Sequence, residues 1–214
     1  MPQFLNYTNL SQNFGGKKVL LFQGCLTRGQ ENRLSKIALA EIGTMKRCVK
    51  IANEQNVSSS TFGQMNILNW KYPESVQLKD TISQCLDRYI DEFSPEYRNG
   101  EIPRYTYGWA NLVKRNLSLQ RPHFHHSNPL NISAILYSVG EYGKNNGATR
   151  FWIEDKQNLT LIPKDVIPQP GMLLMYQATI PHNISFYRSD FPRLTYAFDI
   201  LMNPEPKKMD FTML

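Results

Sequence analysis

Four histidines are the residues whose types and spacing point most directly to chemistry. Three of them lie in the run R-P-H-F-H-H-S, as His123, His125 and His126, and the fourth is His182. Side chains two residues apart on a strand point to the same side, so His123 and His125 can face one point while His126 faces away. In a closed barrel, His182 can join them from a distant strand. Three imidazoles around one point suit iron, zinc, copper or nickel, with positions left open for a cosubstrate and dioxygen.

The second half of the chain has the pattern of short strands that such a site needs. From about Pro103, apolar and β-branched runs alternate with turn residues, and Pro168-Gln169-Pro170-Gly171 is the strongest turn signal. Further turns are expected at 140–147 and at Pro163–Asp165. The predicted strands are Arg104–Val113, Ile132–Val139, Thr149–Ile153, Leu159–Ile162, Met172–Tyr176, Asn183–Tyr187 and Leu194–Leu201. Many short strands with regular turns indicate a barrel or jelly roll.

The first half of the chain is predicted to be helical, with one short buried strand at Val19–Phe22 closed by Gly24. Thr27 and Gln30 have the spacing of a capping box. The helix that follows is expected to place Leu34, Ile37, Ile42, Met45 and Val49 on one face. A second helix opens at Pro73 and Glu74, ends at Ser94-Pro95, and repeats Leu78, Ile82, Cys85, Tyr89 and Phe93 at helical spacing. We expect both helices to cover one face of the β-rich half, without a linker, as one domain spanning residues 1–214.

The composition is that of an ordinary globular protein. The chain has 214 residues, 41% hydrophobic and 20% charged, which is enough for one domain with a full core. The formal net charge is +6 and the pI is about 9.2. Because the lysines and arginines are scattered, this charge indicates a solvated surface, and nucleic-acid binding is not expected. An anionic small substrate would suit a mildly basic protein.

Cysteine usage and hydropathy indicate a cytoplasmic protein. Cys25, Cys48 and Cys85 match no zinc or redox spacing, and an odd, unpatterned set fits a reducing compartment. Residues 1–10 have polar residues throughout and lack the apolar stretch of a signal peptide. No apolar run approaches the roughly 20 residues that a membrane helix needs, so no membrane association is expected.

From about Trp109 to Ile200 the chain resembles the iron(II)- and 2-oxoglutarate-dependent oxygenases. It looks closest to a poorly characterised branch related to prolyl hydroxylases that carries an H-x-H motif. The pieces that carry the resemblance are Trp109-Ala110-Asn111, Pro122-His123-Phe124-His125, Ser133-Ala134-Ile135-Leu136-Tyr137, Gly147-Ala148-Thr149-Arg150-Phe151, Pro168-Gln169-Pro170-Gly171, His182 and Arg193-Leu194-Thr195. Each piece alone is weak, but their order and spacing together are fairly specific.

The resemblance implies a fold, a cofactor set and a reaction. The fold would be α+β but mainly β: a double-stranded β-helix (jelly-roll) core over residues 101–203, with a helical N-terminal support region over residues 1–100 packed on one face. His123, His125 and His182 would bind one Fe(II). Arg193 would bind the distal carboxylate of 2-oxoglutarate, assisted by the hydroxyls of Tyr137 and Thr195, because a planar guanidinium meets a carboxylate bidentately. The enzyme would use O2, with ascorbate as a stimulant, to hydroxylate an unactivated C–H bond and release succinate and CO2.

His125 departs from the pattern of most of this superfamily, which places an aspartate or glutamate at the second ligand position. Three neutral imidazoles leave Fe(II) with its full charge of two, which would raise its reduction potential. Two alternatives are open: His125 is not a ligand and water or chloride fills the position, or His126 is the ligand instead.

Two other functions compete with this interpretation. One is a cupin-like three-histidine metalloenzyme that does not use 2-oxoglutarate, although such an enzyme has no need of Arg193. The other is a non-catalytic jelly-roll binding protein, which the H-x-H departure favours. The substrate, a small molecule or a peptide, would be selected by loops that carry no motif. Plausible pocket residues flank the metal strands: Trp109, Asn111, Gln120, Arg150 and Trp152.

Overall fold

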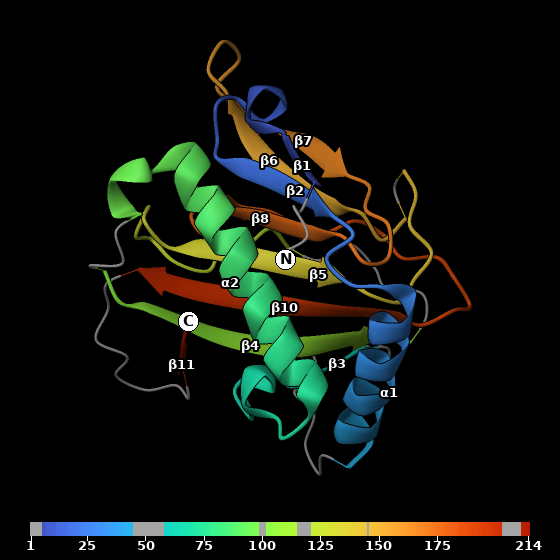
Figure 1. Ribbon diagram of the computed structural model, residues 1–214. Helices are drawn as coiled ribbons and strands as arrows, with labels where there is room; N and C mark the ends of the chain where they lie inside the picture. The colour runs from blue at the N-terminus through green and yellow to red at the C-terminus, as the bar shows by residue number, and fades with distance from the viewer. Residues whose placement is uncertain (1–5, 45–57, 99–101, 115–120, 145, 203–210) are drawn as a thin grey trace.

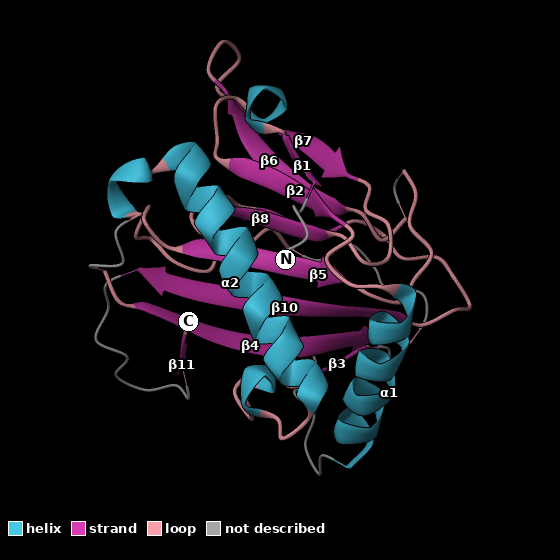
Figure 2. Ribbon diagram, viewed as in Figure 1, coloured by secondary structure: helices cyan, strands magenta, loops and turns pink. Residues whose placement is uncertain are grey.

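Two antiparallel sheets face each other in the computed structural model, which describes residues 6–44, 58–98, 102–114, 121–144, 146–202 and 211–214 (Figures 1 and 2). The large sheet has the order β1-β2-β8-β5-β10-β4-β11, with β3 also paired to β4, and the small sheet has the order β7-β6-β9. The strands are β1 (Asn6–Asn9), β2 (Val19–Gln23), β3 (Ser58–Ser60), β4 (Arg104–Val113), β5 (Ile132–Tyr137), β6 (Thr149–Asp155), β7 (Thr160–Val166), β8 (Leu173–Gln177), β9 (His182–Ile184), β10 (Arg193–Met202) and β11 (Thr212–Met213). The helices are α1 (Arg28–Thr44) and α2 (Pro73–Phe93), with short 3-10 turns at Ser11–Phe14, Ile67–Asn69 and Pro95–Tyr97.

Helices α1 and α2 cover the outer face of the large sheet, as the sequence predicted (Figure 1). In α2 the residues at helical spacing, from Leu78 to Tyr89, are buried in the core that the helices share with the sheet. The capping box that opens α1 is confirmed, since the Gln30 side chain accepts a hydrogen bond from Thr27 N at 2.8 Å and Thr27 Oγ1 accepts one from Gln30 N at 3.3 Å. The expected continuation of this helix to Met45 and Val49 lies outside the described residues. Among the described helices, none is long and apolar enough to cross a membrane.

Strand β10 lies inside the large sheet, between β5 and β4, and every one of its residues is buried. Alternate side chains of a strand point to opposite faces. Leu194, Tyr196, Phe198 and Ile200 belong to the core under the helices. Arg193, Thr195, Ala197 and Asp199 therefore face the small sheet. Polar and charged groups thus occupy the space between the two sheets at both ends of one strand.

The predicted turn at Pro163–Asp165 is wrong, because β7 continues through these residues. The hairpin turns earlier, at 156–159, where the Asp155 carboxylate accepts hydrogen bonds from the backbone N–H groups of Gln157 and Asn158. Pro163 is tolerated since β7 is the edge of its sheet, where the missing N–H breaks no ladder bond. The sequence also missed β11 near the C-terminus, and β1 and β3 in the first 100 residues. The described part of that region therefore supplies three strands, including the predicted β2, as well as the helices.

Gly108 tests the packing between β4 and its neighbours. A Cβ at this position would lie 2.8 Å from Cδ1 of Phe198, its partner on β10, and 3.0 Å from Cγ1 of Ile67. We expect Gly108→Ala to lower the free energy of unfolding by about 1–3 kcal/mol, measured by urea denaturation. The matched control is Gly29→Ala in α1, where the nearest atom is 3.6 Å away and no loss is expected. Equal stabilities of the two variants would contradict this packing.

Candidate metal centre

A backbone bridge brings His123 and His182 together although 59 positions separate them (182 − 123). His123 N donates to His182 O at 2.9 Å, and His182 N donates to His123 O at 2.8 Å. Farther along, His125 N donates to Ala178 O at 3.1 Å. The segment that carries the H-x-H motif therefore runs antiparallel to the chain leading into β9, which in turn pairs with β6.

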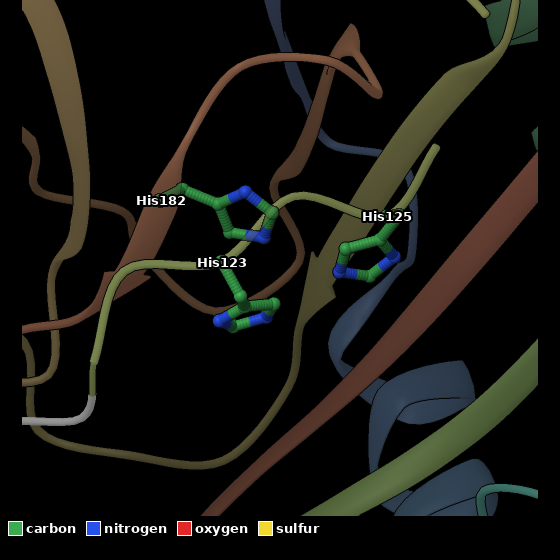
Figure 3. Close-up of side chains that lie close together, drawn as sticks. All are labelled: His123, His125 and His182. Carbon is green, nitrogen blue, oxygen red and sulfur yellow. The ribbon is translucent and has the colours of Figure 1, made fainter. Parts of the chain in front are cut away.

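The side chains of His123, His125 and His182 converge (Figure 3). One nitrogen of each ring can be chosen so that all three lie within 4.8 Å of one another. The ring centroids are 4.7 Å apart for His123 and His182, 5.0 Å for His125 and His182, and 5.4 Å for His123 and His125. His182 is buried, His125 is half-buried and His123 is exposed, so the group is closed on one side and open on the other. The structure brings together the three residues that the sequence selected.

Each of the three rings has its Nδ1 atom next to an acceptor outside the cluster. His182 Nδ1 lies 3.0 Å from Ile180 O, His125 Nδ1 bonds a carboxylate oxygen of Asp199, and His123 Nδ1 has a longer contact of 3.4 Å with Arg121 O. An Nδ1–H that donates outward leaves the lone pair on Nε2, which is the tautomer that a metal-binding imidazole needs. The hydrogen-bond pattern therefore leaves Nε2 of all three rings available as a metal ligand.

The electrostatics of the cluster favour neutral imidazoles. Burial, together with the neighbouring His125 and His123, lowers the pKa of His182 to about 3. Desolvation and His125 also lower the pKa of His123. Because a metal ion binds the deprotonated ring, the site holds these two histidines in the form that coordinates.

Asp199 is the site residue that sequence reasoning missed. It lies on the inner face of β10, 7% exposed, and its Oδ1 atom also accepts a hydrogen bond from Ser133 Oγ at 3.3 Å. Burial raises its pKa, but hydrogen bonds from His125 and, more distantly, His126 outweigh this, and the pKa is lowered to about 2. The available signal was an acidic residue near the end of an otherwise apolar strand.

His126 stands outside the group of three. Its Nε2 atom lies 3.5 Å from Oδ2 of Asp199, so the two neighbouring histidines contact different oxygens of one carboxylate. On the other side of His125, the indole of Trp109 stacks on the imidazole with ring centroids 5.6 Å apart and an interplanar angle of 25°. The ring of His125 is thus fixed at its edge by Asp199 and on its face by Trp109.

Tyr176 contacts the same cluster from β8. Its hydroxyl lies 2.9 Å from His182 Nε2, and its ring meets the imidazole edge-on with centroids 4.9 Å apart. Burial raises the pKa of Tyr176 well above its usual range, so the hydroxyl stays protonated and donates. If Nε2 of His182 held a metal ion, this hydroxyl would need another acceptor.

Arg193 lies at the other end of the inner face of β10 and is 1% exposed. Its guanidinium donates to Gly147 O at 3.4 Å and to Thr195 Oγ1 at 3.3 Å, and it lies 5.8 Å from the ring centroid of Tyr142. No ion pair with a carboxylate forms at Arg193 within the described part of the chain. Burying an unpaired guanidinium costs several kcal/mol, which marks this position as one that can receive an anion.

Tyr137 completes the polar group around Arg193. It is fully buried, pairs directly with Thr195 across β5 and β10, and shares a hydrogen bond with Thr149 Oγ1. Burial raises its pKa to about 12, even though Arg193 and the bond to Thr149 act in the opposite direction. Tyr137 is thus a neutral hydroxyl beside a buried cation.

Two of the expected pocket residues lie on the wrong face of β6. Phe151 points inward, 6.1 Å from the ring of His182, so its neighbours point outward. Arg150 forms a two-pronged ion pair with Asp165 at 2.7 and 2.8 Å, and Trp152 Nε1 donates to Asn183 Oδ1. Asn111, by contrast, faces inward with its β10 partner Thr195, and Gln120 lies outside the described residues.

Solved structures of similar shape were found, although neither a family model nor a curated protein matches the sequence. SnoK, a non-heme α-ketoglutarate-dependent carbocyclase from nogalamycin biosynthesis, is 12% identical with a TM-score of 0.62; the match covers 90% of this chain and 82% of that one. A prolyl-4-hydroxylase from Pseudomonas putida is 13% identical with a TM-score of 0.59, over 89% and 96% of the two chains. HygX from Streptomyces hygroscopicus, solved with nickel, 2-oxoglutarate and hygromycin B bound, is 13% identical with a TM-score of 0.58, over 88% and 84%.

The fold is the double-stranded β-helix. The similarity to these enzymes extends over most of the described chain and confirms the predicted α+β, mainly β class. At these identities the comparison shows the fold, and the chemistry has to be argued from the site itself.

The lowered pKa of His182 makes the metal-free protein sensitive to acid. An unfolded histidine titrates near pH 6.5, so between pH 6.5 and about 3 the unfolded chain takes up a proton at His182 that the folded chain refuses. The contribution of His182 to the free energy of unfolding is therefore fully present above about pH 6.5. It falls as the pH drops, by about 2 kcal/mol at pH 5. In chelator, His182→Gln should show a flatter dependence of unfolding free energy on pH between 7 and 4.5. Parallel curves for the two proteins would contradict the buried, neutral imidazole.

Proposed function

We propose that this protein is an Fe(II)- and 2-oxoglutarate-dependent oxygenase that hydroxylates an unactivated C–H bond. The observation that carries the proposal is the pairing of two separate sites between the same sheets. Three imidazoles prepared as Nε2 donors lie at one end, and a buried arginine without a carboxylate partner in the described chain lies at the other. A metal alone would need only the first of these.

The donor set fits ferrous iron. Neutral imidazole is a ligand of borderline character that suits iron as well as zinc, nickel and copper. Three facial ligands leave coordination positions free, and His123 on the exposed side keeps the approach to them open. That HygX was solved with nickel and 2-oxoglutarate supports a divalent metal with this cosubstrate on the same fold.

The surroundings of Arg193 fit the distal carboxylate of 2-oxoglutarate. A carboxylate there would supply the missing anion and accept two parallel hydrogen bonds from the guanidinium. Thr195 contacts the guanidinium and Tyr137 pairs with Thr195, so their hydroxyls would be additional donors to the same group. Along β10 the inner-face residue between Thr195 and Asp199 is Ala197, which has a small side chain.

Iron and 2-oxoglutarate, when bound, supply the oxidation of a C–H bond by O2, with the release of succinate and CO2. The chain contributes geometry: the three imidazoles would hold the metal, Arg193 would bind the far end of the cosubstrate, and the two sheets would exclude water from that end. The Tyr176 hydroxyl, which contacts His182 Nε2, would be a hydrogen-bond donor at the edge of this site. Since SnoK is a carbocyclase on the same fold, hydroxylation is the specific part of the proposal that product analysis must establish.

Metal binding and uncoupled turnover test the proposed function directly. Protein supplied with Fe(II), ascorbate and 2-oxoglutarate should bind one iron per chain and form succinate slowly without any substrate. His182→Ala should lose both, because it removes the buried ligand of the triad. Iron binding without consumption of 2-oxoglutarate would favour the cupin-like three-histidine enzyme. If the protein binds neither iron nor 2-oxoglutarate, the non-catalytic jelly-roll protein is favoured.

Arg193 tests the cosubstrate half of the site on its own. Arg193→Met should weaken 2-oxoglutarate binding by about 10- to 100-fold, in keeping with the loss of charged hydrogen bonds, and leave one metal bound. Affinity can be measured by calorimetry with Mn(II) in place of iron, without turnover. Arg150→Met is the matched control, since Arg150 pairs with Asp165 on the outer face and should not affect the affinity. Equal losses in both variants would contradict the assignment.

A further inference from the structure

We propose that Asp199 is a positioning residue of the metal centre: it selects His125 as the third ligand and supplies, one ring away from the metal, the negative charge that the H-x-H motif lacks. The inference rests on the proposed function in that it requires a metal at the histidine triad. Of the three alternatives for the third ligand (His125, His126 or an open coordination position), the inference selects His125.

The contacts of Asp199 are almost entirely with this site. Oδ1 bonds Nδ1 of His125 and accepts from Ser133 Oγ, while Oδ2 faces His126. None of the ion pairs of the described residues joins Asp199 to a lysine or arginine. A buried carboxylate costs several kcal/mol to desolvate, and here its charge is directed to the two histidines of the H-x-H-H segment.

The geometry makes His125 the ligand and His126 the support. With Nδ1 bound to Asp199, the ring of His125 can present only Nε2 to His123 and His182. Stacking against Trp109 restricts rotation of the ring out of this plane. His126 faces the other oxygen of the carboxylate, 3.5 Å away, and does not belong to the three residues whose ligand atoms converge.

The three imidazoles are not equivalent in their outer partners. His123 and His182 face backbone carbonyl oxygens, which are neutral acceptors. His125 alone faces a carboxylate, and a carboxylate on Nδ1–H makes the ring a stronger and more anionic donor to the metal. The position where most of the superfamily places an aspartate or glutamate is therefore occupied by a histidine that is itself bonded to an aspartate. This arrangement offsets part of the positive charge that three neutral ligands would leave on the metal.

Cobalt(II) titration of the full chain, without 2-oxoglutarate, tests this role through a readout other than activity. Absorption of bound Co(II) reports both affinity and ligand geometry. We expect Asp199→Ala to weaken Co(II) binding by about 10- to 100-fold and to shift the visible spectrum. Asp199→Asn keeps an oxygen for Nδ1–H but loses the charge, so it should fall between the alanine variant and the wild type. Asp165→Asn, the same change in the carboxylate that pairs with Arg150, is the control and should bind as the wild type does.

A double-mutant cycle separates positioning from general support. If Asp199 acts through His125, Asp199→Ala should cost nothing further in a His125→Ala background. Equal additional losses in both backgrounds would overturn the inference, as would an affinity of Asp199→Ala within twofold of the wild type. The near-isosteric Asp199→Asn variant keeps the test decisive if the alanine variant fails to fold. Should the wild type bind no Co(II), the proposed function falls and this inference with it, whereas binding that is indifferent to Asp199 overturns this inference alone.

Discussion

The paired backbone hydrogen bonds between His123 and His182 are the interaction on which the candidate centre depends. They place two residues from distant parts of the chain opposite each other, at 2.9 and 2.8 Å, without using either side chain. Because the bridge extends the pairing of β9 with β6, the small sheet fixes the backbone at both residues. The imidazoles are then free to meet, and only His125 needs a separate device to hold it.

The inner face of β10 distributes charge unevenly between its two ends. Asp199 has its partners within the protein, since two histidines and a serine surround its carboxylate. Arg193, buried to the same degree, has a carbonyl, a hydroxyl and an aromatic ring but no carboxylate within the described residues. The negative charge of Asp199 therefore has partners within the described chain, whereas the positive charge of Arg193 has no carboxylate there. An anion bound at Arg193 would offset the free energy of burying its guanidinium.

Much of the fold could be predicted from the sequence because periodicity and turn chemistry are local. Helical spacing from Leu78 to Tyr89 and the capping box at Thr27 were sufficient for the helices. The misplaced turn at Pro163 shows the limit: whether a proline interrupts a strand depends on whether that strand is an edge, which is a property of the whole sheet. Asp199 was missed for a related reason, since its meaning arises from contacts with His125 and Ser133, residues far away in the chain.

The two ends of the site differ in how ready they are for a ligand. At the metal end, Nδ1 of each ring already has an acceptor, so binding requires little more than the release of the Tyr176 hydroxyl from Nε2 of His182. Because that hydroxyl is buried, it would then need another acceptor. At the arginine end the favourable energy appears only when an anion arrives. Metal binding would therefore depend on preorganisation, and anion binding at Arg193 on the relief of a buried charge. The two can be separated experimentally although they share one strand.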